Sequence, residues 1–216
     1  MRTKTLLLTA VLSAAGIASS LAQGTVYSVN AVGYVNLVVP VGLSMVANPL
    51  DAGSNNTLGS LFPNVPNFSN FYKFTGTSFD IATFAFGAWD KPNITLNPGE
   101  GGFIGTTTLF TNTFVGEVKQ GTLSTPIPVG LSIVSSQVPQ TGAIDTTLGL
   151  TNLSMFDNVF KFNVTSQSYD IYTVTPGGGW SGPGGSTTAP SLNVAESVFI
   201  SAGAAASWNR TFSVNQ

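Results

Sequence analysis

The sequence predicts an all-β protein built from two homologous antiparallel modules, each β-sandwich or barrel-like, that arose by internal duplication. Short runs rich in Val, Ile, Phe, Tyr and Thr alternate with Gly, Pro, Asn and Ser, and nothing beyond residue 22 sustains a helical period. The chain also repeats itself, because the run Pro40–Ser44 (PVGLS) returns unchanged at Pro128–Ser132. Such self-similarity decides the architecture before any single element is assigned.

The match continues in order almost to the C-terminus. The further matched segments are Tyr72–Phe74 with Phe160–Phe162, Phe79–Ile81 with Tyr169–Ile171, Trp89 with Trp180, and Leu96–Ile104 with Leu192–Ile200. The difference in residue number between a segment and its match in the second copy grows along the chain. The second copy therefore carries small loop insertions. We therefore predict a first β module over residues 23–118 and a second over residues 119–216.

Residues 1–22 are predicted to be a secretory signal peptide. Arg2 and Lys4 give a cationic start, and the apolar stretch Leu6–Ile17 is short for a membrane span. Small residues then occupy the cleavage region at Ser20–Ala22. The alternative, a retained anchor helix, is disfavoured by the length of the apolar stretch. We expect an exported protein with no membrane span in the mature chain.

The strands predicted in the two modules follow the same order. In the first module they are Ala31–Val39, Leu43–Ala47, Asn70–Thr75, Ser78–Phe84, Gly102–Thr106 and Phe110–Val118. In the second they are Leu131–Ser135, Asn158–Val164, Gln167–Val174, Ser197–Ser201 and Ser207–Val214. The segment Phe114–Val118 lies between the copies and is positioned to serve both. Single helical turns are expected near Leu58–Leu61 and Leu148–Leu150, each with an Asn or Asp just ahead as a cap.

A hairpin with the same register is expected in both modules. A two-residue turn at Gly76–Thr77 places Lys73 opposite Asp80, and a matching turn in the second copy places Lys161 opposite Asp170. Because strand side chains alternate, we expect each Lys–Asp pair on the exposed face. The aromatic residues expected to be buried are Phe74, Phe79, Phe162 and Tyr169. A register-fixing surface pair is favoured over a catalytic dyad, since neither residue should be desolvated enough to shift its pKa.

The composition excludes several classes of function. Charged residues make up 7% of the chain, and two of its 7 Lys and Arg lie in the signal peptide, so no basic face exists for nucleic acid or an anionic membrane. The chain has no His and no Cys, which excludes Ser-His-Asp and Cys-His catalysis and most zinc sites. We therefore expect no enzymatic activity, no catalytic residues, no cofactor and no metal.

Two oxygen-rich patterns are weighed against that expectation. Glu100 and Glu196 occupy equivalent positions, and glycoside hydrolysis needs only two carboxylic acids at a set separation. Equivalent positions in two modules usually lie far apart, which disfavours catalysis. Asp51, Ser54, Asn55 and Asn56 offer oxygen ligands for calcium, but the second copy lacks the pattern, so an Asx-rich turn is preferred.

Trp89 and Trp180 are the candidate ligand-binding residues. Both follow the aromatic hairpin and lie beside Gly-rich or polar loops, where an exposed indole would stack on a sugar ring. The alternative, which we favour, is that each Trp closes one core with its N–H bonded to a loop carbonyl. Trp208 falls in the last strand and is expected in the core.

The stretch Val29–Asn36, followed by Pro40 and Gly42–Leu50, resembles a recurrent pattern in secreted, internally duplicated β-rich proteins of environmental Gram-negative bacteria. The segments Tyr72–Gly76 and Leu96–Phe103 fit the same pattern. The resemblance covers most of the mature chain. It implies export to the periplasm, cell surface or exterior of a Gram-negative cell and a β-rich fold, and it carries over no activity.

These observations favour a non-enzymatic secreted or cell-surface protein with a structural or adhesive role. Low charge, the lack of reactive side chains, the many Thr and Asn residues and the duplicated modules all suit that role. The alternative is an extracellular carbohydrate-binding protein with one Trp platform in each module. Expected partners are surface polysaccharide or other extracellular proteins.

Overall fold

Short antiparallel strands joined by turns make up most of residues 31–214, which a computed structural model describes. The predicted signal peptide lies outside the described residues. Helical structure within them is limited to the single turn α2 (Leu58–Leu61) and the 3-10 turns η1 (Gly53–Asn55) and η2 (Pro183–Gly185). The all-β class is therefore confirmed.

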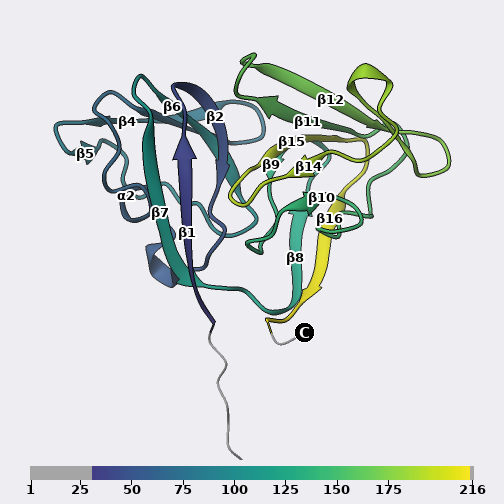
Figure 1. The fold of residues 1–216 in the computed structure, drawn as a ribbon, viewed down its shortest axis with the longest axis horizontal. Helices are drawn as coiled ribbons and strands as arrows, with labels where there is room; N and C mark the ends of the chain where they lie inside the picture. Colours follow the sequence, from purple (N-terminus) through teal and green to yellow (C-terminus); the bar gives the residue numbers. More distant parts are fainter. Residues whose placement is uncertain (1–30, 215–216) are drawn as a thin grey trace, which may run out of the picture. The chain divides into compact units, whose positions relative to one another are not determined.

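The first half of the described chain, residues 31–118, folds into one five-stranded sheet and one two-stranded ribbon. The sheet has the order β2-β6-β3-β4-β5, and the ribbon pairs β1 with β7 (Figure 1). The bounds are β1 Val32–Val39, β2 Gly42–Ala47, β3 Asn70–Phe74, β4 Phe79–Ala85, β5 Ala88–Trp89, β6 Gly101–Thr106 and β7 Phe110–Glu117.

The second half, residues 119–214, repeats this arrangement. Its sheet has the order β9-β15-β11-β12-β13, which matches the first sheet strand for strand, and its ribbon pairs β8 with β16 (Figure 1). The bounds are β8 Gly121–Ile127, β9 Gly130–Val134, β11 Asn158–Asn163, β12 Ser168–Val174, β13 Trp180–Ser181, β15 Val198–Ala202 and β16 Ala206–Phe212. A small extra ladder joins β10 (Gly142–Ala143) to β14 (Ser191–Leu192).

Two local expectations need correction, and one of the longer strands was not predicted. The segment Phe114–Val118 does not serve both halves, because β7 pairs with β1 and bridges to Asp51, both in the first half. A strand missed in the sequence, β8, pairs with β16. The segment Leu148–Leu150 is not helical. There the chain makes hydrogen-bonded turns in which Leu148 N–H donates to Ala143 O at 2.9 Å and Leu150 N–H donates to Ile144 O at 2.7 Å.

The register of both hairpins is confirmed, but the assignment of their faces is wrong except for Phe162, which is buried as expected. Lys73 lies opposite Asp80 and Lys161 opposite Asp170. On the face of β3 that carries Lys73, however, Phe71 is completely buried, so this face covers the core of its own half. The aromatic face points the other way, and Phe79 and Tyr169 each stay 40% exposed. The sequence pattern gave no means of telling which of two apolar faces would be more deeply covered.

The partners of the two lysines also differ from the expectation. Lys73 pairs with Glu100 at 3.0 Å and Lys161 with Glu196 at 3.5 Å, in both cases on the turn that precedes the neighbouring strand. Asp80 instead pairs with Lys91 at 2.5 Å. The cross-strand position was right, but the long lysine side chain reaches a carboxylate beyond its facing residue.

Each half has its own inner core between sheet and ribbon. The largest fully buried side chains of the first core are Phe62, Phe71, Phe114, Leu50, Leu58, Leu96 and Ile104. Those of the second core are Ile127, Ile144, Leu148, Leu150 and Leu192, joined by Trp208. Nevertheless the residues from Ala31 onward form one compact unit, so the halves are not separate bodies.

A third apolar cluster joins the halves through the outer faces of the two sheets. Its buried members are Met45, Phe103, Ile133, Phe162 and Phe199. The ring of Phe74 meets Phe199 at 5.2 Å between centroids, and the equivalent pair Phe162 and Phe103 meets at 5.5 Å. Contacts between the halves therefore come in matched pairs, as in the isologous interface of a symmetric dimer.

Main-chain contacts between the halves follow the same symmetry. Ala47 N–H donates to Ala195 O, and the equivalent Ser135 N–H donates to Gly99 O, both at 2.9 Å. Where equivalent positions meet, Gly101 faces Ser197, and a Cβ on Gly101 would lie 2.4 Å from the Ser197 Cβ. The first copy therefore needs glycine where the second keeps a serine.

Candidate functional site

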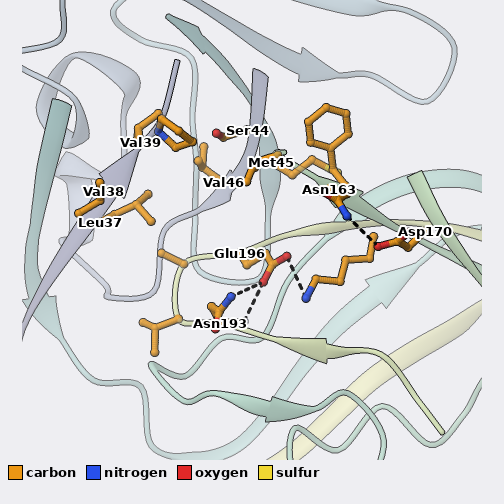
Figure 2. Close-up of a pocket in the computed structure, with 16 residues that line it drawn as sticks. Leu37, Val38, Val39, Ser44, Met45, Val46, Asn163, Asp170, Asn193 and Glu196 are labelled. Atoms are coloured by element: carbon orange, nitrogen blue, oxygen red, sulfur yellow. Dashed lines mark hydrogen bonds and ion pairs between the residues drawn. The ribbon is translucent and has the colours of Figure 1, made fainter. Parts of the chain in front are cut away.

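Two grooves lie between the halves at equivalent positions. The first, of about 340 Å³, is lined by β1 and β2 on one side and by the end of β11 and the turn before β15 on the other (Figure 2). The second, of about 400 Å³, is lined by the equivalent segments with the halves exchanged: β8 and β9, the end of β3 and the turn before β6. Both volumes fall within the range of small-ligand sites.

The polar side of the first groove is organised by Glu196 (Figure 2). Its Oε2 accepts hydrogen bonds from Asn193 N–H at 2.8 Å and Asn193 Nδ2 at 3.2 Å, which closes the turn before β15. Its Oε1 lies 3.5 Å from Lys161 Nζ, and Lys161 also donates to Ser191 O at 2.6 Å. The carboxylate thus ties its own turn to its own sheet.

The second groove repeats this arrangement with Glu100. Its Oε2 accepts from Asn97 N–H at 2.7 Å and lies 3.0 Å from Lys73 Nζ. Each lysine charge is therefore matched by a glutamate of the same half. The two glutamates are turn-closing groups held by separate lysines, an arrangement that does not bring them together as an acid and nucleophile pair.

Each groove also carries a serine hydroxyl without a protein partner. Ser44 on β2 and the equivalent Ser132 on β9 have buried Oγ atoms that make no hydrogen bond. Buried polar atoms nearly always find a partner, so such groups call for one from outside the chain, either water or a ligand. These grooves are therefore suited to binding an uncharged polar group.

Residues 31–214 hold no group of three or more His, Cys, Asp or Glu placed to hold a metal ion. The Asx-rich turn is found as preferred, because Asp51 Oδ1 accepts from Gly53 N–H at 2.9 Å and from Asn56 Nδ2 at 2.8 Å. Burial raises the pKa of Asp51, but these bonds and Lys119 outweigh it, and the pKa lies below its ordinary value.

The structure places both candidate tryptophans in the cores. Trp89 is 5% exposed and its Nε1 donates to Phe62 O at 2.9 Å, while Trp180 is 8% exposed and donates to Asp145 Oδ2 at 3.0 Å. Neither indole has a face exposed to solvent. Trp89 and Trp180 therefore do not form exposed platforms in the fold of residues 31–214. The physical reason is that each indole covers the end of an inner core while its N–H reaches a loop acceptor.

Sequence reasoning missed the side chains that are exposed. Tyr34 is 69% exposed on β1, and Phe68, Phe86 and Phe156 are 67%, 95% and 63% exposed on turns. All three phenylalanines have a positive φ, at 67°, 55° and 72°. Left-handed backbone is costly for residues other than Gly, Asn and Asp, so phenylalanine in these turns is a departure from local preference.

Comparisons with known proteins give no relative, since no family model, no curated protein and no solved structure matches the chain. Among residues 31–214, no helix has the length and apolar character needed to cross a membrane.

Proposed function

We propose that this is a non-enzymatic structural or adhesive protein, exported to the cell surface or beyond, whose contact surface is the outer face of the β1–β7 ribbon. One observation carries the proposal. On that face Tyr34 lies opposite Val115, and both are exposed, whereas the equivalent pair on the β8–β16 ribbon is Thr122 opposite Thr211.

The two ribbons share their pairing register but differ in the apolar character of their outer faces. Both carry a cross-strand polar bond of 2.7 Å at the next outer pair, Thr113 to Asn36 in one and Ser124 to Asn209 in the other. The first ribbon adds Val32 and Val38, which are 72% and 57% exposed. The second ribbon does without such residues, so the exposed apolar side chains on either side of the Asn36–Thr113 pair support a role in contact with a partner.

The partner that best suits this face is another extracellular protein. A flat strand surface with valine, tyrosine and threonine buries apolar area on contact, at about 25 cal/mol per Å². Glu117, opposite Val32, is the one charged side chain among the outer pairs of the described ribbon, so electrostatic attraction contributes little.

A second candidate function, carbohydrate binding, is favoured by Tyr34 itself. An exposed aromatic ring next to the polar pair Asn36 and Thr113 is suited to stacking on a sugar ring while amide and hydroxyl groups bind its hydroxyls. Under this alternative the platform is Tyr34 on one ribbon, in place of one Trp in each half.

The test exchanges the two faces. The double variant Tyr34→Thr with Val115→Thr gives the first ribbon the outer pair of the second, and both sites are exposed, so the melting temperature should barely change. We expect several-fold weaker retention on protein-coated and apolar surfaces, with no change on uncharged glycan arrays. The matched control, Thr122→Tyr with Thr211→Val, should increase retention.

Unchanged retention in both double variants would remove the ribbon face as the contact surface. Saturable glycan binding by the parent protein that is lost with Tyr34→Thr alone would decide for the carbohydrate-binding candidate.

A further inference from the structure

The two grooves differ at the outer edge of their edge strands. At β2, the side-chain amide of Gln167 stands where a neighbouring strand would be. Its Oε1 accepts from Leu43 N–H at 2.8 Å, and its Nε2 donates to Leu43 O at 3.0 Å. One carboxamide thus reproduces both bonds that a residue of an added strand would make.

The equivalent position on β9 is Leu131, and its register is the same. Leu43 lies opposite Gly105 on β6, and Leu131 lies opposite the matching Ser201 on β15. Since Leu43 directs its N–H and C=O away from β6, Leu131 directs the same two groups away from β15. Within residues 31–214, nothing outside the ladder bonds to Leu131, which is 45% exposed.

A difference in hairpin length accounts for this asymmetry. After the pair Phe162 and Tyr169, the β11–β12 hairpin adds the pair Asn163 and Ser168 before it turns, and Gln167 lies in that turn. The β3–β4 hairpin turns directly after the pair Phe74 and Phe79. The shorter first hairpin therefore has no residue that reaches the edge of β9.

The backbone of Gln167 indicates that the cap on β2 is specifically held. Its φ of 50° lies in the left-handed region, which is costly for a residue other than glycine. Three hydrogen bonds of the side-chain amide offset that cost, two to Leu43 and one from Nε2 to Val164 O at 2.8 Å.

The second groove adds the walls that a bound segment needs. Residues Leu131–Val134 of β9 line one side, and Lys73–Gly76 line the other. The Ser132 hydroxyl lies in this groove without a partner, and the Lys73 charge is matched by Glu100. This pair therefore adds no net charge to the groove. The N–H and C=O of Leu131 at the edge of β9 are suited to bind main-chain amides.

We propose that the open edge of β9 binds an extended, uncharged peptide segment of a partner protein by strand addition. The N–H and C=O of Leu131 form two main-chain hydrogen bonds with one partner residue, in the place that Gln167 fills on β2. The bound segment is short, because Ser135 N–H already donates to Gly99 O at the far end of the edge. This goes beyond the proposed function and holds whether or not the β1–β7 ribbon is adhesive.

The probe is an acetylated, amidated pentapeptide of alternating threonine and valine, titrated into the ¹⁵N-labelled protein. We expect a saturable shift of the Leu131 amide resonance, with slowed hydrogen exchange there and no change at Leu43. One pair of main-chain bonds with side-chain contacts should give a dissociation constant of about 0.1–1 mM.

Two variants test the role of the edge directly. Gln167→Ala removes the cap from β2, so the same peptide should bind a second site that reports at Leu43. Leu131→Pro removes the N–H that faces the open edge while leaving the ladder to β15 intact, and should abolish binding. The matched control Leu131→Ala keeps the N–H and should retain binding.

Grafting the turn of the β11–β12 hairpin onto the β3–β4 hairpin tests the proposal without relying on the proline variant to fold. Replacing Thr75–Ser78 by the six residues Asn163–Ser168 lengthens the first hairpin to match the second, and the new glutamine should cap β9 and block the peptide. No saturable shift at Leu131 up to about 10 mM peptide would overturn the proposal. So would undiminished binding in the graft, or the failure of Gln167→Ala to gain a site at Leu43.

Discussion

The first and second halves share the same strand order and the same contacts with each other, yet they differ on the surfaces that face solvent. Phe74 and Phe162 each pack on a phenylalanine of the opposite half. Outside the interface, by contrast, Tyr34 of the first half is replaced by Thr122. Packing between two sheets permits little change on either side, whereas an exposed strand face accepts almost any residue that favours β structure.

The difference teaches where to look for function in a fold whose two halves have the same strand order. Features that both halves keep, such as the Lys–Glu pairs beside the grooves, close turns and fix the sheets. Features present in one half only, namely the apolar ribbon face, the Gln167 cap and the Phe86 turn, are not required to build a half. Because the fold does not require these unmatched features, binding to a partner is the function that would account for them.

The largest expected effect comes from the cores, which the halves have in common. Trp89→Ala and Trp180→Ala should each lower the free energy of unfolding by about 3–5 kcal/mol, because a large buried ring is removed. Both variants should unfold in urea in a single transition, since the cluster around Phe103 and Phe199 couples the halves. Acrylamide should quench neither indole efficiently in the native parent protein.

Two separate transitions in either variant would show that the halves are independent bodies. If Trp→Ala lowers the free energy of unfolding by less than about 1 kcal/mol, that tryptophan is exposed and becomes a candidate ligand-binding residue again, because only an exposed ring contributes so little to stability.

The next effect concerns the place where equivalent residues of the halves meet. Gly101→Ala adds a Cβ 2.4 Å from the Ser197 Cβ and 2.6 Å from Ile133 Cγ2, so it should cost about 1–3 kcal/mol as overpacking. Ser197→Gly should cost about 0.5–1.5 kcal/mol, because the 3.0 Å bond from its hydroxyl to Val46 O is lost.

The double variant, Gly101→Ala with Ser197→Gly, moves the side chain from one side of the interface to the other. It should be less destabilised than the sum of the single variants, because the serine is no longer there to meet the new methyl group. Strict additivity in urea melts would mean that Ile133 alone sets the cost of Gly101→Ala.

Much of the fold followed from the sequence because it depends on local chemistry. Alternating strand patterns, the repeat of Pro40–Ser44 and the hairpin pairings of Lys73 and Lys161 all involve residues near in sequence or copied in order. The preferred core position of Trp89 and Trp180 also followed, since a large ring beside a loop most often covers a core.

The rest depended on long-range packing that one sequence does not reveal. The aromatic faces around Phe79 and Tyr169 were expected inside their own halves, but they meet across the interface, which no local pattern indicates. The edge cap formed by Gln167 joins residues 124 positions apart, and only the extra hairpin pair hinted at it. The exposed face of the β1–β7 ribbon was missed because the sequence pattern predicts that these segments are strands, but it does not show which face of the paired strands is exposed to solvent.

The smallest expected effect is a gain in stability at a turn that the second half lacks. Phe86 and Gly87 form a two-residue turn between β4 and β5, with φ values of 55° and 85°, and Phe86 is 95% exposed. Such turns favour Asn-Gly, because asparagine tolerates the left-handed backbone at the first position. Phe86→Asn should therefore raise the free energy of unfolding by about 1 kcal/mol.

If the exposed ring of Phe86 also serves adhesion, the same variant should reduce retention on apolar surfaces while it stabilises the fold. Phe86→Ala, which removes the ring without improving the turn, separates the two effects: it should lose retention without the gain in stability. A stabilised Phe86→Asn variant with full retention would limit the adhesive surface to the β1–β7 ribbon.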